Sequence, residues 1–436
     1  MGFWRRGIWR RRSTGLLSIV VSSIKLSNFY VRSGLFSVLS LAGAFFAYAI
    51  YPVLTRILNA QEFGDFAVIV ALSNQLLGIL LAFNIISIYL VKSRPEAEAR
   101  SHAQIIQKTL LWFFLGASLV LLALSPFLNE LLQIDNPAYF LVLGLILLTA
   151  VPGVIWTGYL QGHKELVRVG AFSLSSSLGK LVFASAFALT LGTVGGLLGM
   201  LMGTLVGLLV IYLAPGVKLP SLTSLFTKSD PAERKFLLGM KKYFLECMLV
   251  VGALGLLQNY DITLAKALFS PAEAGVYSGI SVLSNALYFL SFLLIWIVLP
   301  EIKLGDNAVN RRVLGTAYKL LAGLSAAALA VELLLKDHLT GWLLGKNFAG
   351  GGELLIFATL YQLTLVAIAL YTFYLLVTRQ RRVVLLATAC LLPAAVVPII
   401  YADSPLEMVR LLWFALLAGT GLYVLLLNIL RLRRHA

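Results

Sequence analysis

Basic residues occupy every second gap between the long apolar segments of this sequence. Twelve segments are long enough to cross a bilayer as helices, because a span needs about 20 residues at 1.5 Å each. They lie at approximately 34–58, 64–91, 105–128, 138–160, 168–190, 194–214, 243–265, 274–299, 313–335, 354–377, 383–401 and 406–430. Of 35 Lys and Arg residues, 29 lie in the N-terminal arm, in alternate gaps or in the C-terminal tail. Loops rich in Lys and Arg stay in the cytoplasm, so the alternation supports the segment count and predicts that both termini are cytoplasmic.

The composition excludes an ordinary soluble domain. Apolar residues make up 60% of the chain and charged residues 12%, and no polar stretch is long enough for a separate soluble domain. The net charge of +16 lies mostly beside the spans on one side. It would meet anionic lipid headgroups there, so membrane lipids rather than nucleic acid are the expected partners. The sequence therefore predicts an all-α integral membrane protein.

Two short stretches resemble one another at corresponding points of the two halves. Residues 62–66 read Glu-Phe-Gly-Asp-Phe, with Leu-Ser-Asn at 72–74; residues 273–277 read Glu-Ala-Gly-Val-Tyr, with Leu-Ser-Asn at 283–285. Nearly the same offset aligns Arg56 with Lys266. Because six spans are an even number, this predicts about twelve transmembrane helices in two six-helix lobes related by a parallel pseudo-twofold repeat. The expected parts are a basic amphipathic arm (1–33), an N-terminal lobe (34–214), a cytoplasmic linker (215–242) and a C-terminal lobe (243–436).

Patterns that carry catalysis or bind metals are not found in the sequence. Gly179-Lys180 and Gly345-Lys346 lack the spacing of a phosphate-binding loop and its following Ser or Thr, which argues against ATP hydrolysis. None of the four histidines has a partner at metal-ligand spacing, and Cys247 and Cys390 fit small core residues. We therefore expect no enzyme, no cofactor and no metal site.

Four glycines in the sixth segment share one helical face. They stand four residues apart, at 195, 199, 203 and 207. Small residues at this spacing allow two helix backbones to approach closely in lipid, so the pattern predicts tight helix packing.

Four basic residues within or beside the spans are the candidate substrate-binding residues: Arg32, Arg56, Lys180 and Lys266. Lys180 lies near the middle of the fifth span beside several serines, which indicates a hydrated cavity. Arg56 and Lys266 lie near the outer ends of the first and seventh spans, where they would suit a pyrophosphate or reach lipid headgroups. Arg32 begins the first span on the cytoplasmic side, where it would meet an entering phosphate or a headgroup.

Asp261 is the candidate ion-coupling residue. It ends the polar run 258–261, Gln-Asn-Tyr-Asp, in an otherwise apolar seventh span. A carboxylate is costly in hydrocarbon, so two roles are open for it. It is either a cation or proton site, or it forms a structural ion pair with Lys266 or Arg56.

Two stretches carry a resemblance to a known family. Residues 54–66, Leu-Thr-Arg-Ile-Leu-Asn-Ala-Gln-Glu-Phe-Gly-Asp-Phe, resemble the signature between helices one and two of polysaccharide (O-antigen) flippases. These flippases belong to the multidrug/oligosaccharidyl-lipid/polysaccharide exporter superfamily. Residues 342–351 resemble the connection before helix ten in that family, with Phe348 at the usual Tyr position. Twelve spans favour the O-antigen or capsule branch over the peptidoglycan-precursor flippases, which usually have fourteen.

The resemblance implies transport of an undecaprenyl-diphosphate-linked oligosaccharide from the inner to the outer leaflet of a bacterial or archaeal cell membrane. The lobes would enclose a V-shaped cavity that opens alternately to each side, and a polysaccharide polymerase and a chain-length regulator would be further partners. The alternatives are a multidrug/cation antiporter of the same superfamily, a membrane glycosyltransferase or polymerase, and a non-transporting scaffold. An antiporter would favour acidic over basic cavity residues, so the charge of the cavity discriminates between the two transporters.

Overall fold

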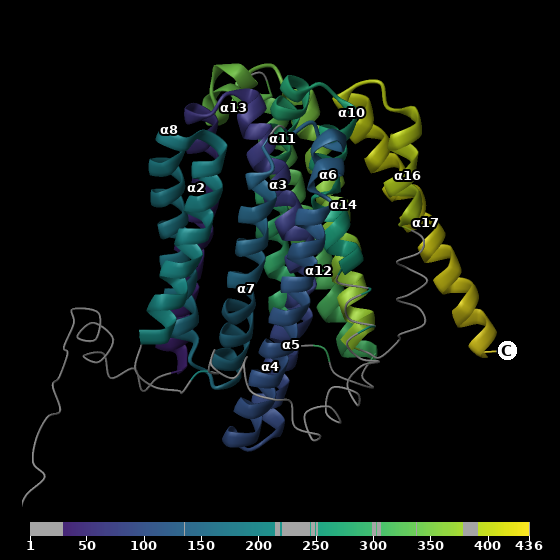
Figure 1. Cartoon of the computed structure of the whole chain (residues 1–436). Helices are drawn as coiled ribbons and strands as arrows, with labels where there is room; N and C mark the ends of the chain where they lie inside the picture. Colours follow the sequence, from purple (N-terminus) through teal and green to yellow (C-terminus); the bar gives the residue numbers. More distant parts are fainter. Residues whose placement is uncertain are drawn as a thin grey trace, which may run out of the picture.

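The computed structural model describes residues 29–134, 136–213, 252–298, 307–336, 338–377 and 391–435, with isolated positions between them. These residues form helices and short connections, and no strand is found among them. Most helices run side by side through the molecule (Figure 1). The connections from α2 to α3 and from α10 to α11 lie at the upper face of that view, with α13, and the connections from α4 to α5 and from α7 to α8 at the lower face.

The N-terminal half supplies six spans. Its helices are α2 (Phe29–Ile57), α3 (Ala60–Gly78), α4 (Leu80–Ser93), α5 (Glu96–Ala123), α6 (Ser125–Leu131), α7 (Ala138–Gly162) and α8 (Leu166–Leu213). The second predicted span is divided into α3 and α4. The 48 residues of α8 fold back on themselves at Gly192, whose φ of 56° is favoured only for glycine, so α8 supplies both the fifth and the sixth span.

The C-terminal half follows the same plan. Its elements are α10 (Tyr260–Leu268), α11 (Pro271–Val298), α12 (Asn307–Leu335), α13 (Leu339–Leu344), the 3-10 turn η3 (Lys346–Phe348), α14 (Gly352–Val377), α16 (Leu392–Tyr401) and α17 (Pro405–His435). The seventh predicted span continues before α10 as helix from Gly252 to Gln258 and is interrupted at Asn259. The eleventh ends in α16.

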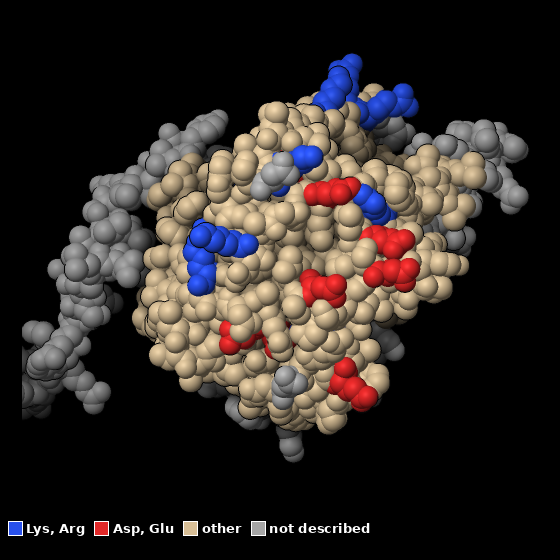
Figure 2. Space-filling view, turned by 90° about the horizontal axis from the view of Figure 1, so that it is seen from above, with Lys and Arg blue, Asp and Glu red and all other residues tan. Residues whose placement is uncertain are grey.

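The outer surfaces of the lobes suit a membrane. Among the described residues, seven helices are by themselves long and apolar enough to cross a bilayer, and one of them is the folded α8. Large apolar side chains such as Leu189, Leu209, Leu320 and Leu334 are exposed on these helices. Charged side chains are few and scattered on the upper face (Figure 2). The fold prediction is therefore confirmed: the chain is an all-α membrane protein whose spans divide into two six-helix lobes.

The two lobes meet at the residues that the repeat relates. Gly64 of α3 and Gly275 of α11 are repeat equivalents, and they are in direct backbone contact. A Cβ built on Gly275 would lie 1.9 Å from the carbonyl oxygen of Ala60, and a Cβ on Gly64 would lie 2.9 Å from the Gly275 Cα. Equivalent residues meet each other only on a twofold axis, so this contact marks the pseudo-twofold axis of the repeat.

The same repeat is visible in how α3 and α11 begin. Asn59 and Glu62 form a reciprocal capping box at the start of α3, with hydrogen bonds of 2.9 and 3.0 Å. Ser270 and Glu273, their equivalents, exchange the same two bonds at the start of α11, at 3.4 and 3.2 Å. The boxes satisfy backbone N–H groups that a helix start leaves free, and they fix both helices at the same end of the molecule.

Several expectations lie outside the described residues. They are most of the N-terminal arm (1–28 of 1–33), the linker 215–242 apart from Leu219, and Cys247 and Cys390. Arg32 belongs to α2, but its side chain is also outside the described part.

The glycine face of the sixth span packs the second arm of α8 directly on the first. An added Cβ would lie 2.1 Å from the Ala184 backbone nitrogen at Gly199, and 2.1 Å from the Lys180 backbone nitrogen at Gly203. The two antiparallel arms therefore touch through their backbones, as the glycine spacing predicts.

We expect Gly199→Ala to destabilise the protein, because the methyl group has no room between the arms and overpacking costs about 1–3 kcal/mol or more. Gly323→Ala in α12 is the matched control, since nothing lies within 4 Å of its Cβ position and alanine favours a helix. Thermal unfolding of the detergent-purified variants would show a lower Tm for Gly199→Ala only. Equal Tm values for the two variants would contradict the close approach.

Candidate functional site

The lobes are joined near the upper face by a set of contacts that we call the upper gate, formed by Arg56, Phe63, Asp65, Lys266 and Phe348. Lys266 of α10 places its Nζ 2.6 Å from Oδ1 of Asp65 in α3, and the lysine side chain is fully buried. The rings of Phe63 and Phe348 meet edge to face, with centroids 6.0 Å apart. An ion pair and an aromatic pair therefore close the space between the lobes on this side.

Arg56 completes the upper gate from the first lobe. Its Nη1 donates to the carbonyl oxygens of Pro52 at 2.6 Å and Leu343 at 2.9 Å, and its Nη2 donates to the carbonyl of Trp342 at 2.8 Å. The guanidinium thus joins α2 to α13 in the other lobe. Arg56 and Lys266 hold equivalent places in the repeat, and each reaches across to the opposite lobe. In this state neither base lies in an open cavity, and whether they bind a diphosphate stays a prediction.

A cavity of about 200 Å³ lies inside the N-terminal lobe, between α3, α7 and both arms of α8. Of the residues that line it, Lys180 alone is charged, and it stands among Ser73, Asn74, Thr157, Ser176 and Thr204. The close approach of Gly203 to the backbone of Lys180 fixes the lysine on this wall. No hydrogen bond or ion pair to its ammonium group is found in the described part of the chain, so Lys180 offers a positive charge to whatever enters the cavity.

Asp261 is held inside the C-terminal lobe. Its Oδ2 accepts hydrogen bonds from the Tyr277 hydroxyl at 2.9 Å and from the Ser281 hydroxyl, and the carboxylate is fully buried. Both donors stand on one face of α11, four residues apart. The second oxygen, Oδ1, has no hydrogen-bond partner among the described residues. The expected alternative, an ion pair with Lys266 or Arg56, does not form in this state, because Lys266 pairs with Asp65 and Arg56 binds backbone carbonyls.

The break in the seventh span lies next to Asp261. At this break the carbonyl oxygens of Leu257 and Gln258 point out of the helix, and α14 satisfies both. The Tyr361 hydroxyl donates to Leu257 at 2.6 Å, and the Gln362 amide donates to Gln258 at 3.0 Å. Irregular backbone is tolerated at membrane depth only where protein or water satisfies its hydrogen-bonding groups. The side chains that do so here make this part of the lobe polar.

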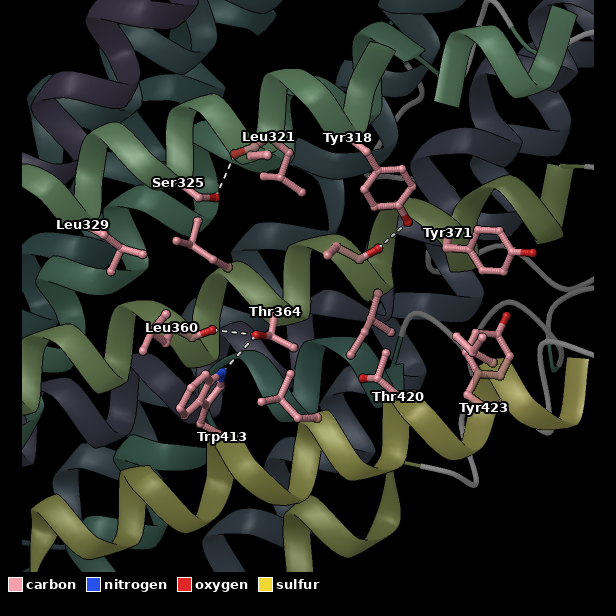
Figure 3. A pocket seen from close by; sticks show the side chains of 16 residues that line it. Tyr318, Leu321, Ser325, Leu329, Leu360, Thr364, Tyr371, Trp413, Thr420 and Tyr423 are labelled. Atoms are coloured by element: carbon pink, nitrogen blue, oxygen red, sulfur yellow. Dashed lines mark hydrogen bonds between the residues drawn. The ribbon is translucent and has the colours of Figure 1, made fainter. Parts of the chain in front are cut away.

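A crevice of about 730 Å³, larger than the Lys180 cavity, lies in the C-terminal lobe between α12, α14 and α17. No charged residue lines it. Several of its polar side chains hydrogen-bond within the crevice wall, as Figure 3 shows for Tyr318 to the Ala367 carbonyl, Trp413 to Thr364 and Ser325 to the Leu321 carbonyl. The crevice therefore offers contacts to hydrocarbon and little to a charged group, and size alone does not identify the site of a polar substrate.

Asp65 is the site residue that reasoning from the sequence missed. It stands in the second-span motif beside Gly64, and its partner Lys266 lies in the other half of the chain. The sequence did indicate a role for Asp65, because a carboxylate in an apolar helix needs a buried partner. Only the packing of the lobes shows which base that partner is.

Among the described residues, no group of three or more His, Cys, Asp or Glu side chains is placed to hold a metal ion.

We expect Lys266→Met to destabilise the protein by about 3–5 kcal/mol, because it leaves the Asp65 carboxylate buried without its base. Replacing both partners, as in Lys266→Met with Asp65→Leu, removes the uncompensated charge and should restore most of the loss. Thermal unfolding in detergent measures both variants. A single variant as stable as the wild type, or a double variant no better than the single one, would show that the pair is not the buried contact described.

The sequence itself matches no protein-family model and no curated protein. Solved structures do match. The lipid II flippase MurJ in an inward closed conformation is 13% identical, with a TM-score of 0.67 over 90% of this chain and 87% of MurJ. An inward-facing multidrug resistance MATE family transporter of the MOP superfamily is 14% identical, with a TM-score of 0.65 over 89% and 95% of the two chains. A eukaryotic MATE transporter is 13% identical, with a TM-score of 0.56 over 93% and 96%.

These similarities cover nearly the whole of each chain, and they agree with the two lobes described above. At 13–14% identity such matches establish the architecture and leave the transported substrate open. The protein has the fold of the transporters and flippases of the MOP superfamily.

Proposed function

We propose that this protein is a flippase that moves an undecaprenyl-diphosphate-linked oligosaccharide from the cytoplasmic to the outer leaflet for surface polysaccharide synthesis. The observation that carries the proposal is Lys180. It is a base near the middle of a span, it lines a largely apolar cavity that also carries Ser, Thr and Asn side chains, and it has no anionic partner among the described residues. A lysine at this depth is costly unless it serves a polar ligand, and a diphosphate is the part of such a substrate that needs a positive charge.

The upper gate supports alternating access. Contacts between the lobes close the molecule near the upper face, while the Lys180 cavity lies within the N-terminal lobe. We assign the lower face to the cytoplasm, because the predicted cytoplasmic gaps carry most of the Lys and Arg residues. The substrate headgroup would then enter from the cytoplasmic leaflet. Separation of the lobes at the upper gate would release it outside, with the lipid chain remaining in the bilayer.

The charge of the cavity distinguishes this proposal from a multidrug/cation antiporter. A cationic drug needs a carboxylate where it binds, yet the described lining of the Lys180 cavity contains no Asp or Glu. Asp261 is buried in the other lobe and is bound by Tyr277 and Ser281. The arrangement favours an anionic substrate.

A membrane glycosyltransferase or polymerase is the alternative from another class. The solved structures reported above are a flippase and two transporters. Purified protein that joined or cleaved lipid-linked sugars without a partner would replace the flippase proposal. A polysaccharide polymerase and a chain-length regulator are the partners that the proposal implies in the cell.

The test is leaflet-resolved transport of an undecaprenyl-diphosphate-linked oligosaccharide in vesicles that contain only this protein. We expect protein-dependent movement for the wild type. Absence of movement for several glycans, with protein shown to be folded, would overturn the proposal.

Lys180→Met is expected to lower the transport rate about tenfold or more, since a hydrogen bond to a charged group contributes about 1.5–3 kcal/mol. Methionine keeps the length of the side chain and removes its charge. Lys319→Met on the exposed face of α12 is the matched control and should transport normally. Wild-type transport by Lys180→Met, at matched protein levels in the vesicles, would remove Lys180 from the substrate site.

We further propose that Asp261 couples transport to a cation or proton gradient, because its Oδ1 is buried without a partner in a polar part of the lobe. Asp261→Asn keeps the shape and the acceptor for Tyr277 and removes the charge. Transport by this variant should lose its dependence on the proton or sodium gradient. An unchanged response to both gradients would exclude the coupling role.

A further inference from the structure

A small pocket lies on the pseudo-twofold axis, between the lobes. The first lobe contributes Tyr48, Tyr51 and Asn74 to its wall, and the second contributes Asn259, Asn285 and Phe289. Asn74 and Asn285 are repeat equivalents, the last residues of the two Leu-Ser-Asn stretches. Two amide side chains thus reach one pocket from corresponding positions in the two lobes.

Two of the amides have unused hydrogen-bonding groups. Asn259 and Asn285 are 3% and 5% exposed, and neither Nδ2 of Asn259 nor Oδ1 of Asn285 has a hydrogen-bond partner among the described residues. A buried hydrogen-bonding group without a partner lowers the stability of a protein by about 1–3 kcal/mol. The pocket therefore presents a donor and an acceptor that a ligand with hydroxyl groups would satisfy together.

Aromatic rings line the same pocket. The Tyr48 ring lies 6.0 Å from the Tyr51 ring and 5.7 Å from the Phe289 ring, and the Tyr48 hydroxyl donates to the backbone carbonyl of Asn285 at 2.9 Å. Flat apolar rings beside amide groups match the faces of a sugar ring, which carry C–H groups and are edged by hydroxyls. Neither a diphosphate nor a hydrocarbon chain would use both features.

The pocket adjoins the Lys180 cavity. Asn74 belongs to the lining of both, so a ligand that extends from one space into the other passes this side chain. In the present state the pocket holds about 20 Å³, room for one water molecule. Its walls come from different lobes, so a movement of the lobes apart would widen it.

We propose that this axial pocket is a saccharide subsite, which binds the sugar attached to the diphosphate while Lys180 binds the phosphate. The inference rests on the proposed function and adds to it the residues that recognise the glycan. Asn259 and Asn285 hydrogen-bond the sugar hydroxyls, and Tyr48, Tyr51 and Phe289 pack on the ring. Position on the axis gives both lobes a contact with the same sugar.

The test compares the binding of two probes to the full-length protein in lipid nanodiscs: undecaprenyl diphosphate alone, and the same lipid carrying one N-acetylglucosamine. We expect the wild type to bind the glycosylated lipid about threefold to tenfold more tightly, the range expected for one net hydrogen bond. Asn285→Ala should lose this difference and bind the bare lipid as the wild type does. Lys180→Met should weaken the binding of both lipids.

Ser284→Ala is the matched control, because Ser284 is buried next to Asn285 but donates within its own helix to the Ser281 carbonyl. It should keep the preference for the sugar. Tyr51→Leu, on the other lobe, is a second variant that should lose the preference even if Asn285→Ala does not fold.

The outcomes separate the two proposals. Equal binding of both lipids by the wild type, or a preference retained in Asn285→Ala and Tyr51→Leu, would overturn the saccharide subsite alone. If folded wild-type protein bound neither lipid, the proposed function would fail, and this inference with it.

Discussion

The backbone contact between Gly64 and Gly275 is the constraint on which the arrangement of the two lobes depends. Each glycine stands one turn inside a helix whose start is fixed by a capping box, Asn59 with Glu62 and Ser270 with Glu273. Because neither residue has a side chain, α3 and α11 cross at backbone distance and bring the ends of both lobes together. The side chains of the upper gate can reach across only because this approach is so close.

The upper gate uses the repeat in two different ways. Arg56 binds backbone carbonyls of the opposite lobe, whereas Lys266 pairs with the carboxylate of Asp65. Carbonyl acceptors are neutral, so Arg56 can move away from them without leaving an unpaired negative charge behind. Separation of Lys266 from Asp65 exposes two charges that are now buried, and water or a substrate must then solvate them. Opening at this side is therefore easiest when an ionic or hydrated ligand is already between the lobes.

Periodicity and charge predicted the spans, the two lobes and the packing of the glycine face, because these depend on features local to each segment. The partners of single polar residues were less accessible. An ion pair with Lys266 or Arg56 was one of two roles left open for Asp261, but the carboxylate meets Tyr277 and Ser281. Nothing in the sequence around these two residues of α11 indicates that contact before α11 packs on α10. No Gly or Pro stands at the break at Asn259 to indicate it in the sequence. The carbonyl oxygens that the break leaves free are bound by residues of α14, which is far away in the sequence. Contacts between segments far apart in sequence leave little trace in either segment alone.

The two lobes share one plan and differ in the sign of the charge that each holds at its centre. The N-terminal lobe places a lysine on a cavity wall, and the C-terminal lobe encloses an aspartate among hydroxyl groups. An anion and a cation attracted to these positions would occupy separate lobes and could not neutralise each other by contact. Any coupling between two such ligands would therefore act through a relative movement of the lobes and not through direct contact of their charges.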